Sequence, residues 1–227
     1  MISLSDMKKI ALLLTAMACV CMLHAQQGLK IGVRVGPTFT STNVLDATTK
    51  TVMDINQQGS GGYTFGIVAN NGFAENYAFH TGVHVVRKGF SYMLNIEDST
   101  GTTAISRENR ITSLEIPLGL KLRTNELGDG LHIMGRFGTT LDLNLGFRQT
   151  EKIGDEPPLD NQRSNQINKL GGALFAGLGA EMEQEFGTLA FDISYHHGLA
   201  NINNKNNGIP NASVRLRYVA IAASYFF

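Results

Sequence analysis

Apolar side chains recur at every second position along most of this chain. The clearest case is its last segment, in which Val219, Ile221, Ala223, Tyr225 and Phe227 fall on alternate positions. A period of two is that of a β-strand with one apolar face. Frequent glycine argues against helices, because each glycine inside a helix costs up to about 1 kcal/mol. The segments with this period predict eight strands, at 29–40, 62–70, 77–86, 113–123, 131–147, 171–183, 188–198 and 215–227.

The links between these segments alternate in length. Long polar links alternate strictly with short links rich in Gly, Asn and Asp. This composition is typical of hairpin turns. The short links are 71–76, 124–130 and 183–187, and the long ones are 41–62, 90–110, 149–169 and 200–212. Nothing in a soluble β-sandwich requires loop lengths to alternate in this way. An outer-membrane barrel has tight periplasmic turns at one end and long extracellular loops at the other. The sequence therefore predicts an all-β fold, an eight-stranded antiparallel up-and-down transmembrane β-barrel.

The apolar segments are long enough to cross a bilayer, which takes strands of about 9–11 tilted residues. Aromatic residues near their ends predict two interfacial girdles. The girdle on the long-loop side would hold Phe39, Tyr63, Phe147 and Tyr195, and the girdle on the short-turn side would hold Tyr77, Phe79, Tyr225 and Phe227. Because every backbone polar group in lipid has to be paired internally, the last strand is expected to pair with the first and close the sheet.

Three places interrupt the alternation. Pro117 has no N–H for a sheet ladder, and a closed barrel has no free edge where a proline is tolerated, so a local β-bulge is expected there. The alternation also shifts near Val85 and Val86, and again between Leu216 and Val219. Bulges near a barrel rim are common and would explain both shifts.

The N-terminal segment has the layout of a secretory signal peptide. Lys8 and Lys9 precede an apolar run over 10–23, which is short for a spanning helix, and the small residue Ala25 follows. Cleavage between Ala25 and Gln26 would leave a single barrel domain, 26–227, without cysteine and hence without disulfides or thiolate metal sites. The removed segment carries two lysines and one aspartate of the chain's 19 basic and 19 acidic residues, so the mature net charge is about −1. Such a balance does not favour nucleic acid as a partner.

The polar face of the strands predicts a network of charges inside the barrel. Eight strands enclose a lumen just wide enough for side chains. Buried charges in so narrow a space have to pair, so we expect a plugged interior, with a narrow or gated pore as the alternative. The residues of this network are Arg34, Glu115, Lys121, Arg123, Arg136, Asp142, Glu181 and Asp192.

Signals for catalysis, metals and cofactors are weak. His80 and His84 face the same way but lie about 13 Å apart along a strand, too far to share a metal ion. Asp192, Ser194 and His196 share one face of one strand and are expected to be too far apart for a catalytic triad. We therefore expect no enzyme activity, no metal and no cofactor.

Three stretches and the aromatic end carry a resemblance to a known family. The stretches SLEIPLGLKLR, GRFGTTLDLNLG and SYHHGLANI are similar to those of the outer-membrane β-barrel domain common in Bacteroidota, a group that includes PorT-type proteins. The resemblance covers about 29–227. It implies an eight-stranded barrel that the barrel-assembly machinery inserts, with Tyr225 and Phe227 as the assembly signal. A few members of the family are tied to protein secretion.

These features together predict a monomeric, non-enzymatic protein of the bacterial outer membrane, in contact with its lipid. Its role would be structural, in surface interaction, or as a narrow porin-like channel. Two alternatives stay open, which are a component of a protein-secretion apparatus and a soluble periplasmic calyx that binds an apolar ligand. The direction of the side chains in 114–122 distinguishes the calyx from a membrane barrel. In a calyx the leucines of this segment point inward, whereas in a membrane barrel Glu115 and Lys121 do so.

Overall fold

The computed structural model describes residues 28–46, 56–98, 101–153, 159–162, 167–202 and 212–227. Nearly all of them lie in strands, which are β1 (Leu29–Asp46), β2 (Asn56–Ala74), β3 (Tyr77–Asp98), β4 (Gly101–Arg123), β5 (Leu131–Ile153), β6 (Leu159–Gln162), β7 (Leu170–Gln184), β8 (Gly187–Gly198) and β9 (Ala212–Phe226). The eight expected strands correspond to β1–β5 and β7–β9, and β6 is a short addition between β5 and β7. Within these ranges no helix is long and apolar enough to cross a membrane.

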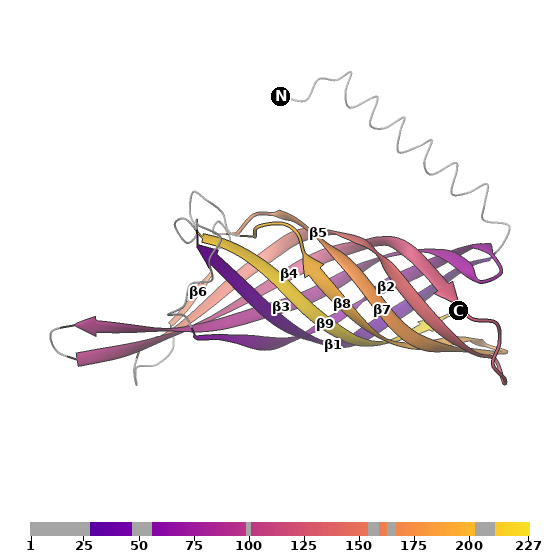
Figure 1. Cartoon of the computed structure of the whole chain (residues 1–227), viewed down its shortest axis with the longest axis horizontal. Helices are drawn as coiled ribbons and strands as arrows, with labels where there is room; N and C mark the ends of the chain where they lie inside the picture. The colour runs from indigo at the N-terminus through magenta and orange to yellow at the C-terminus, as the bar shows by residue number, and fades with distance from the viewer. Residues whose placement is uncertain (1–27, 47–55, 99–100, 154–158, 163–166, 203–211) are drawn as a thin grey trace, which may run out of the picture.

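The eight long strands form one closed ring (Figure 1). Neighbours pair antiparallel in the order β4-β3-β2-β1-β9-β8-β7-β5, and β5 pairs with β4 to complete the ring. The last strand pairs with the first from Gly32↔Phe226 to Asp46↔Ala212, as its apolar face predicts. The predicted eight-stranded antiparallel barrel is therefore confirmed.

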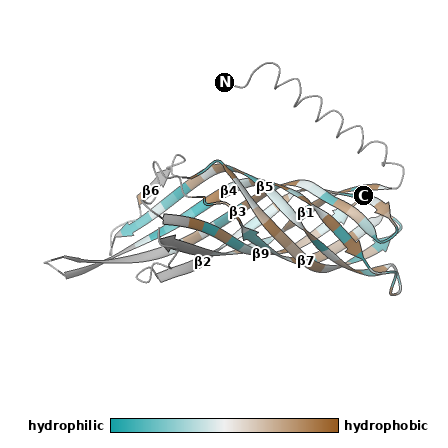
Figure 2. Cartoon of the chain, turned by 45° about the horizontal axis from the view of Figure 1, so that its top comes forward, coloured by the Kyte–Doolittle hydropathy of each residue, from teal (hydrophilic) through white to brown (hydrophobic). Residues whose placement is uncertain are grey.

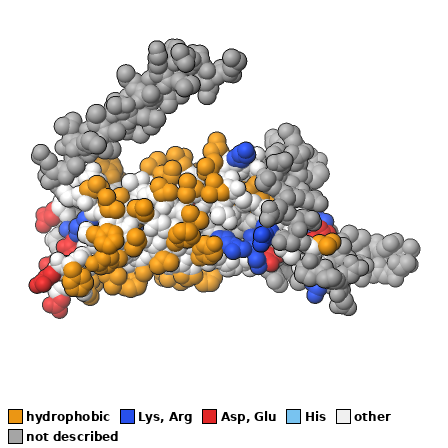
Figure 3. All heavy atoms as spheres, turned by 180° about the vertical axis from the view of Figure 1, so that it is seen from behind, with side chains coloured by type: hydrophobic (Ala, Val, Ile, Leu, Met, Phe, Trp, Pro, Cys, Tyr) orange, Lys and Arg blue, Asp and Glu red, His pale blue; other side chains and the backbone are white. Residues whose placement is uncertain are grey.

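The apolar face of each strand points away from the barrel axis. On β4, Leu118 is 48% exposed, whereas its polar neighbours Glu115 and Lys121 are 2% and 7% exposed. The same arrangement on the other long strands gives the barrel an apolar band around its middle, of which Figures 2 and 3 show part. A soluble calyx requires the opposite arrangement, so that alternative is wrong.

Several strands continue well into the links that were expected to be loops. β3 and β4 remain paired as far as Asp98↔Gly101 and form a hairpin that projects beyond the rest of the barrel (Figure 1). Period-two alternation does not reveal these extensions, because a hairpin in water needs no apolar face. Its antiparallel ladder supplies the backbone hydrogen bonds, whatever the side chains are.

The expected bulge at Pro117 is wrong. Pro117 pairs with Thr140 of β5 in unbroken register. On the β3 side the ladder is interrupted between Thr81↔Leu118 and His84↔Glu115, but the register is the same before and after the gap. The barrel therefore tolerates the missing N–H by leaving a gap in one ladder, without inserting a residue.

A real register shift between β4 and β5 lies elsewhere. Thr112 pairs with Gly146 and Ser113 with Asn144, so β5 contains one extra residue at Leu145. Beyond this bulge the faces of β5 are exchanged. Phe147 is consequently buried in the barrel at 8% exposure, and its predicted place in the outer aromatic girdle is wrong.

The two predicted shifts of alternation, in β3 and β9, are also wrong. Val86 is buried at 1% and Leu216 at 6%, each in step with the other inward residues of its strand. The register shift near Val86 adds its extra residue to β2, between Ser60 and Thr64. The pattern looked shifted because the interior itself becomes apolar toward the long-loop end.

A charge placed on the outer face tests the orientation of the strands. We expect Leu118→Lys to lower the free energy of unfolding by about 2–4 kcal/mol, because a lysine near the bilayer midplane is costly. The same substitution at Leu127, 62% exposed in the turn between β4 and β5, is expected to cost little. Equilibrium unfolding by urea in lipid vesicles measures both. Equal costs at the two positions would contradict a lipid-facing Leu118.

Candidate functional site

The inner wall of the barrel carries the clustered polar side chains, and the end with short turns holds an open cavity among them. This cavity has a volume of about 400 Å³ and is named the vestibule here. Its lining includes Lys30 of β1, Asn70 of β2, Lys121 and Arg123 of β4, and Glu181 of β7.

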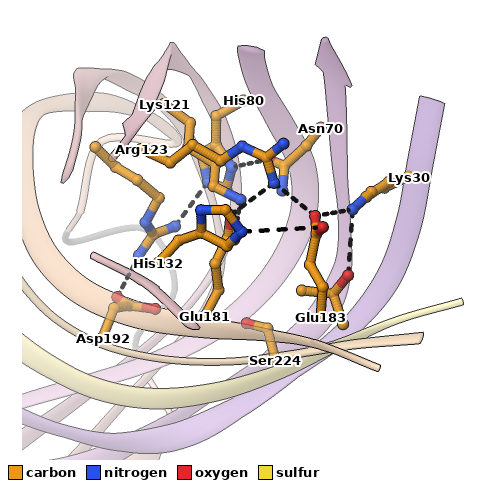
Figure 4. A network of polar contacts seen from close by, with 12 residues as sticks. Lys30, Asn70, His80, Lys121, Arg123, His132, Glu181, Glu183, Asp192 and Ser224 are labelled. Atoms are coloured by element: carbon orange, nitrogen blue, oxygen red, sulfur yellow. Dashed lines mark hydrogen bonds and ion pairs between the residues drawn. The ribbon is translucent and has the colours of Figure 1, made fainter. Parts of the chain in front are cut away.

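Ion pairs cross the vestibule from three strands (Figure 4). Glu183 accepts hydrogen bonds from Lys30 at 2.7 Å and from Arg123 at 2.5 Å. The deeper Glu181 is paired with Lys121 and lies 3.6 Å from Arg123. The two carboxylates of β7 thus hold β1 and β4 together across the lumen.

A second cluster lies one layer deeper, around Asp192 of β8. Arg34 reaches this carboxylate with both terminal nitrogens, at 2.5 and 2.9 Å, and Arg136 is paired with it from the opposite wall. Arg136 also donates to His80 Nε2 at 2.8 Å, and His80 Nδ1 lies 2.8 Å from Asn70 Oδ1. Because a guanidinium can only donate, His80 carries its proton on Nδ1 and is neutral in this arrangement.

Stacked rings fill the middle of the lumen above this cluster. His196 lies between Phe175 and Tyr218, with ring centroids 5.6 and 4.2 Å apart. The wall is tight here, since a Cβ at Gly119 would lie 2.7 Å from Phe175 Cζ. The free space in this layer is about 20 Å³, which is room for a single water molecule.

Lys88 is the centre of a third cluster and is not among the residues predicted to lie inside the barrel. It lies between Glu115, with which it is paired, and Asp142, whose carboxylate is 3.0 Å from Nζ. Tyr218 donates to the other oxygen of Glu115 at 2.5 Å. The predicted strand ended at Val86 because of the supposed shift. Continuing the alternation from His84 through Val86 would have placed Lys88 inside.

Apolar residues close the long-loop end of the lumen. This cluster, named the apolar cap, consists of Phe90, Ile111, Phe147, Ile167, Val214 and Leu216, with Ile202 packed against it. Ile167 and Ile202 come from segments between strands. Backbone hydrogen bonds hold them over the opening, from Asn168 N to Ile202 O at 2.8 Å and from Ile202 N to Val214 O at 2.9 Å.

The structure places the predicted charge network as follows. Arg34 and Arg136 meet at Asp192, Glu115 and Asp142 meet through Lys88, and Lys121, Arg123 and Glu181 meet in the wall of the vestibule. Arg123 lies nearest the opening, with its side chain 26% exposed.

The remaining candidate residues do not form a catalytic or metal centre among the described residues. Ser194 Oγ lies 3.2 Å from His196 Nε2, closer than expected for two residues of one strand. Asp192 is engaged by the two arginines, so a Ser-His-Asp relay is not formed. Over the described ranges no group of His, Cys, Asp and Glu is arranged to hold a metal ion.

The expected processing and assembly residues lie at or beyond the short-turn end. Ala25 and Gln26 fall outside the described residues. Tyr225 donates to Phe186 O at 2.7 Å, and its ring lies 5.3 Å from that of Phe227. Phe227 is 75% exposed on the outer face, and its N–H donates to Ile31 O of β1.

Removing the hydroxyl of Tyr218 tests how much the inner polar clusters contribute to the free energy of unfolding. We expect Tyr218→Phe to lower the free energy of unfolding by about 1–3 kcal/mol, because Glu115 would keep its burial and lose a donor. Tyr195→Phe is the matched control on the outer face, where the hydroxyl contacts His197 at 3.3 Å, and is expected to stay within about 0.5 kcal/mol of the native chain. Chemical unfolding in detergent micelles measures both. A loss no larger than that of the control would contradict the role assigned to this bond.

Several solved structures are similar to this chain at low sequence identity. OprG from Pseudomonas aeruginosa is 14% identical, with a TM-score of 0.43, over 90% of this chain and 98% of that one. Neisserial surface protein A is 12% identical, with a TM-score of 0.39, over 88% and 99%. The outer membrane protease OmpT from Escherichia coli is 10% identical, with a TM-score of 0.39, over 89% and 98%. No curated protein sequence matches the chain.

The family comparison agrees with the barrel, the apolar band and the polar interior described above. The model of the outer membrane protein beta-barrel domain matches residues 24–204, which is most of the sequence. A membrane-spanning barrel of this family resides in the bacterial outer membrane. The chain belongs to the outer membrane protein beta-barrel domain family.

Proposed function

We propose that this protein is a non-conducting barrel that acts through the surface at its long-loop end. The observation that carries the proposal is the succession of layers in the lumen. The ion pairs of the vestibule wall are followed by the Asp192 cluster, the stacked rings, the Lys88 cluster and the apolar cap. Two spaces within this succession, one in the ring layer and one beside Lys88, measure about 20 Å³ each. A hydrated ion needs a wider and continuous path, so the closed lumen favours a structural or surface role over a channel.

The proposed role is not enzymatic. Ser194 and His196 are in contact, but both face the closed interior, where Ser194 is 1% exposed. A substrate reaching Ser194 would have to displace the ring stack or the ion pairs. A nucleophile also needs an oriented base, and the carboxylate two residues away is committed to Arg34 and Arg136.

The long-loop end is the proposed extracellular surface. Barrels of the outer membrane have short periplasmic turns and long external loops, and the β3–β4 hairpin projects from the long-loop end. At the opposite end, Ala74 and Tyr77 are joined by two residues only. The hairpin and its neighbouring segments are thus offered to partners outside the cell, while the vestibule opens to the periplasm.

Assembly is proposed to use the C-terminal strand. The exposed ring of Phe227 and the partly exposed ring of Tyr225 lie at the edge that joins β9 to β1, where the barrel-assembly machinery would engage them. The finished barrel is proposed to be a monomer surrounded by lipid, since its apolar band encircles the wall. A Bacteroidota affiliation and a PorT-like secretion role stay predictions from the resemblance, and the contacts described here favour neither.

Ion conductance tests the closed lumen directly. We expect purified protein in planar bilayers to show no steady openings at moderate voltage. We also expect Leu216→Ala, which thins the apolar cap, to stay silent, because the ion-pair layers beneath it remain. Discrete, reproducible openings of the native protein would contradict a non-conducting barrel.

Cysteine labelling tests the orientation separately. If the predicted signal peptide is removed, the mature chain has no cysteine, so single cysteines can be introduced without background. We expect Lys152→Cys, exposed near the long-loop end, to react with a membrane-impermeant maleimide on intact cells. Leu127→Cys, in the turn between β4 and β5, should react only after the outer membrane is permeabilised. The reverse result would mean that the vestibule faces outward.

A further inference from the structure

Arginines end the outer apolar face of three neighbouring strands at the long-loop boundary. On β3 the outward series Tyr77, Phe79, Thr81, Val83, Val85 ends at Arg87, and on β4 the series Leu122 to Leu114 is followed by Thr112 and Arg110. On β5 the apolar residues up to Leu145 are followed, past the bulge, by Arg148. Basic side chains accordingly border the apolar band at this end (Figure 3).

The three arginines lie around one point of the wall and are named the arginine patch here. Arg110 and Arg148 are direct cross-strand partners, and Arg87 is the cross-strand partner of Thr112, two residues from Arg110. Direct partners have Cβ atoms about 5 Å apart and diagonal ones about 7–8 Å, so the guanidinium groups can meet at one ligand. The β5 bulge brings Arg148 to the outer face and so creates this patch.

The charges of the patch favour an anion between its members. Like charges directly opposite on neighbouring strands are destabilising unless they are compensated. Glu108 accepts a hydrogen bond from Arg110 at 2.7 Å and thus offsets part of the charge. The guanidinium of Arg87 lies 5.9 Å from the centre of the Tyr63 ring. This cation–π contact keeps the charge of Arg87 at the membrane–water interface, where aromatic residues gather.

The opposite boundary of the barrel has the reverse charge. Exposed carboxylates of the short turns lie there, from Glu75, Glu126, Asp129 and Glu185 (Figure 3). Exposed acidic turns at one boundary and arginines on β3–β5 at the other therefore favour the arginine patch as the place where an anionic lipid binds.

We propose that the arginine patch binds the phosphate of a lipid headgroup in the leaflet around the long-loop end. Its position at the edge of the apolar band places the guanidinium groups at headgroup level while the acyl chains lie along the leucines below. Planar guanidinium groups bind phosphate oxygens in a bidentate manner. Basic residues near a membrane surface attract anionic lipid.

Local fluorescence quenching can test this site because the chain has no tryptophan. A reporter at Leu114→Trp lies on the outer face of β4, one pleat repeat from Thr112. A matched reporter at Leu122→Trp lies on the same face at the short-turn end. Purified full-length protein in vesicles is titrated with brominated phosphatidic acid or brominated phosphatidylcholine. The ratio of the two binding constants at each tryptophan is the measured quantity.

At Leu114→Trp we expect phosphatidic acid to bind at least about fivefold more tightly than phosphatidylcholine. At Leu122→Trp we expect the two lipids to bind equally well. Adding Arg110→Gln and Arg148→Gln should bring the first ratio close to one, and Arg148→Gln alone should lower it if the double variant folds poorly. Lys152→Gln removes the same charge farther from the apolar band and should leave the ratio unchanged. Heat-dependent mobility in gels verifies folding of each variant.

Three results would overturn the proposal. The first is a ratio near one at Leu114→Trp with all arginines present. The second is an equal preference at both reporters, or an equal loss with Lys152→Gln, since either would show a general charge effect. The third is loss of the preference when inorganic phosphate is added at constant ionic strength, because that would assign the patch to free anions and not to lipid.

Discussion

Charge pairing inside a closed ring is the interaction on which the rest of this structure depends. Closure pairs the backbone of each long strand with a neighbour on both sides, but it also forces half of the side chains into a lumen that eight strands make narrow. Ionised groups there are stable only with partners within reach. Asp192 with Arg34 and Arg136, and Lys88 between two carboxylates, meet that condition. The outer face is then free to be almost wholly apolar.

The interior changes its chemistry along the barrel axis. Partly exposed ion pairs at the vestibule give way to fully buried ones, then to stacked rings, and finally to aliphatic and aromatic contacts in the apolar cap. Each layer excludes water by a different means. The described residues thus fill the lumen with side chains of the barrel wall and of the segments over its long-loop end, without a plug domain among them.

Much of the fold is predictable from the sequence, because period-two alternation and the order of short and long links depend only on local residue types. The eight strands, their outward apolar face and the inward charges follow from these. The errors arise where the outcome depends on how neighbouring strands meet. Leu145 is an extra residue in β5, and a bulge of this kind depends on how two strands meet, which neither sequence contains alone. Phe147 was placed on the outer face because this bulge was not foreseen. Lys88 was missed because the apolar inner surface near Val86 imitates a shift of strand faces, so the predicted strand ended too early. Pro117 shows the opposite error, since a ladder can lose a hydrogen bond and keep its register.

The seam between β1 and β9 also has a kinetic consequence. It joins residues from opposite ends of the barrel domain, such as Gly32 and Phe226, whereas the neighbouring hairpins join residues close in sequence. Contacts of such long range lose loop-closure entropy before any stabilising interaction forms. They therefore slow folding. The hairpins can therefore form early and independently, whereas the closed barrel forms only when β1 and β9 pair. Commitment to the folded state is accordingly expected to occur at a single late event at the terminal strands.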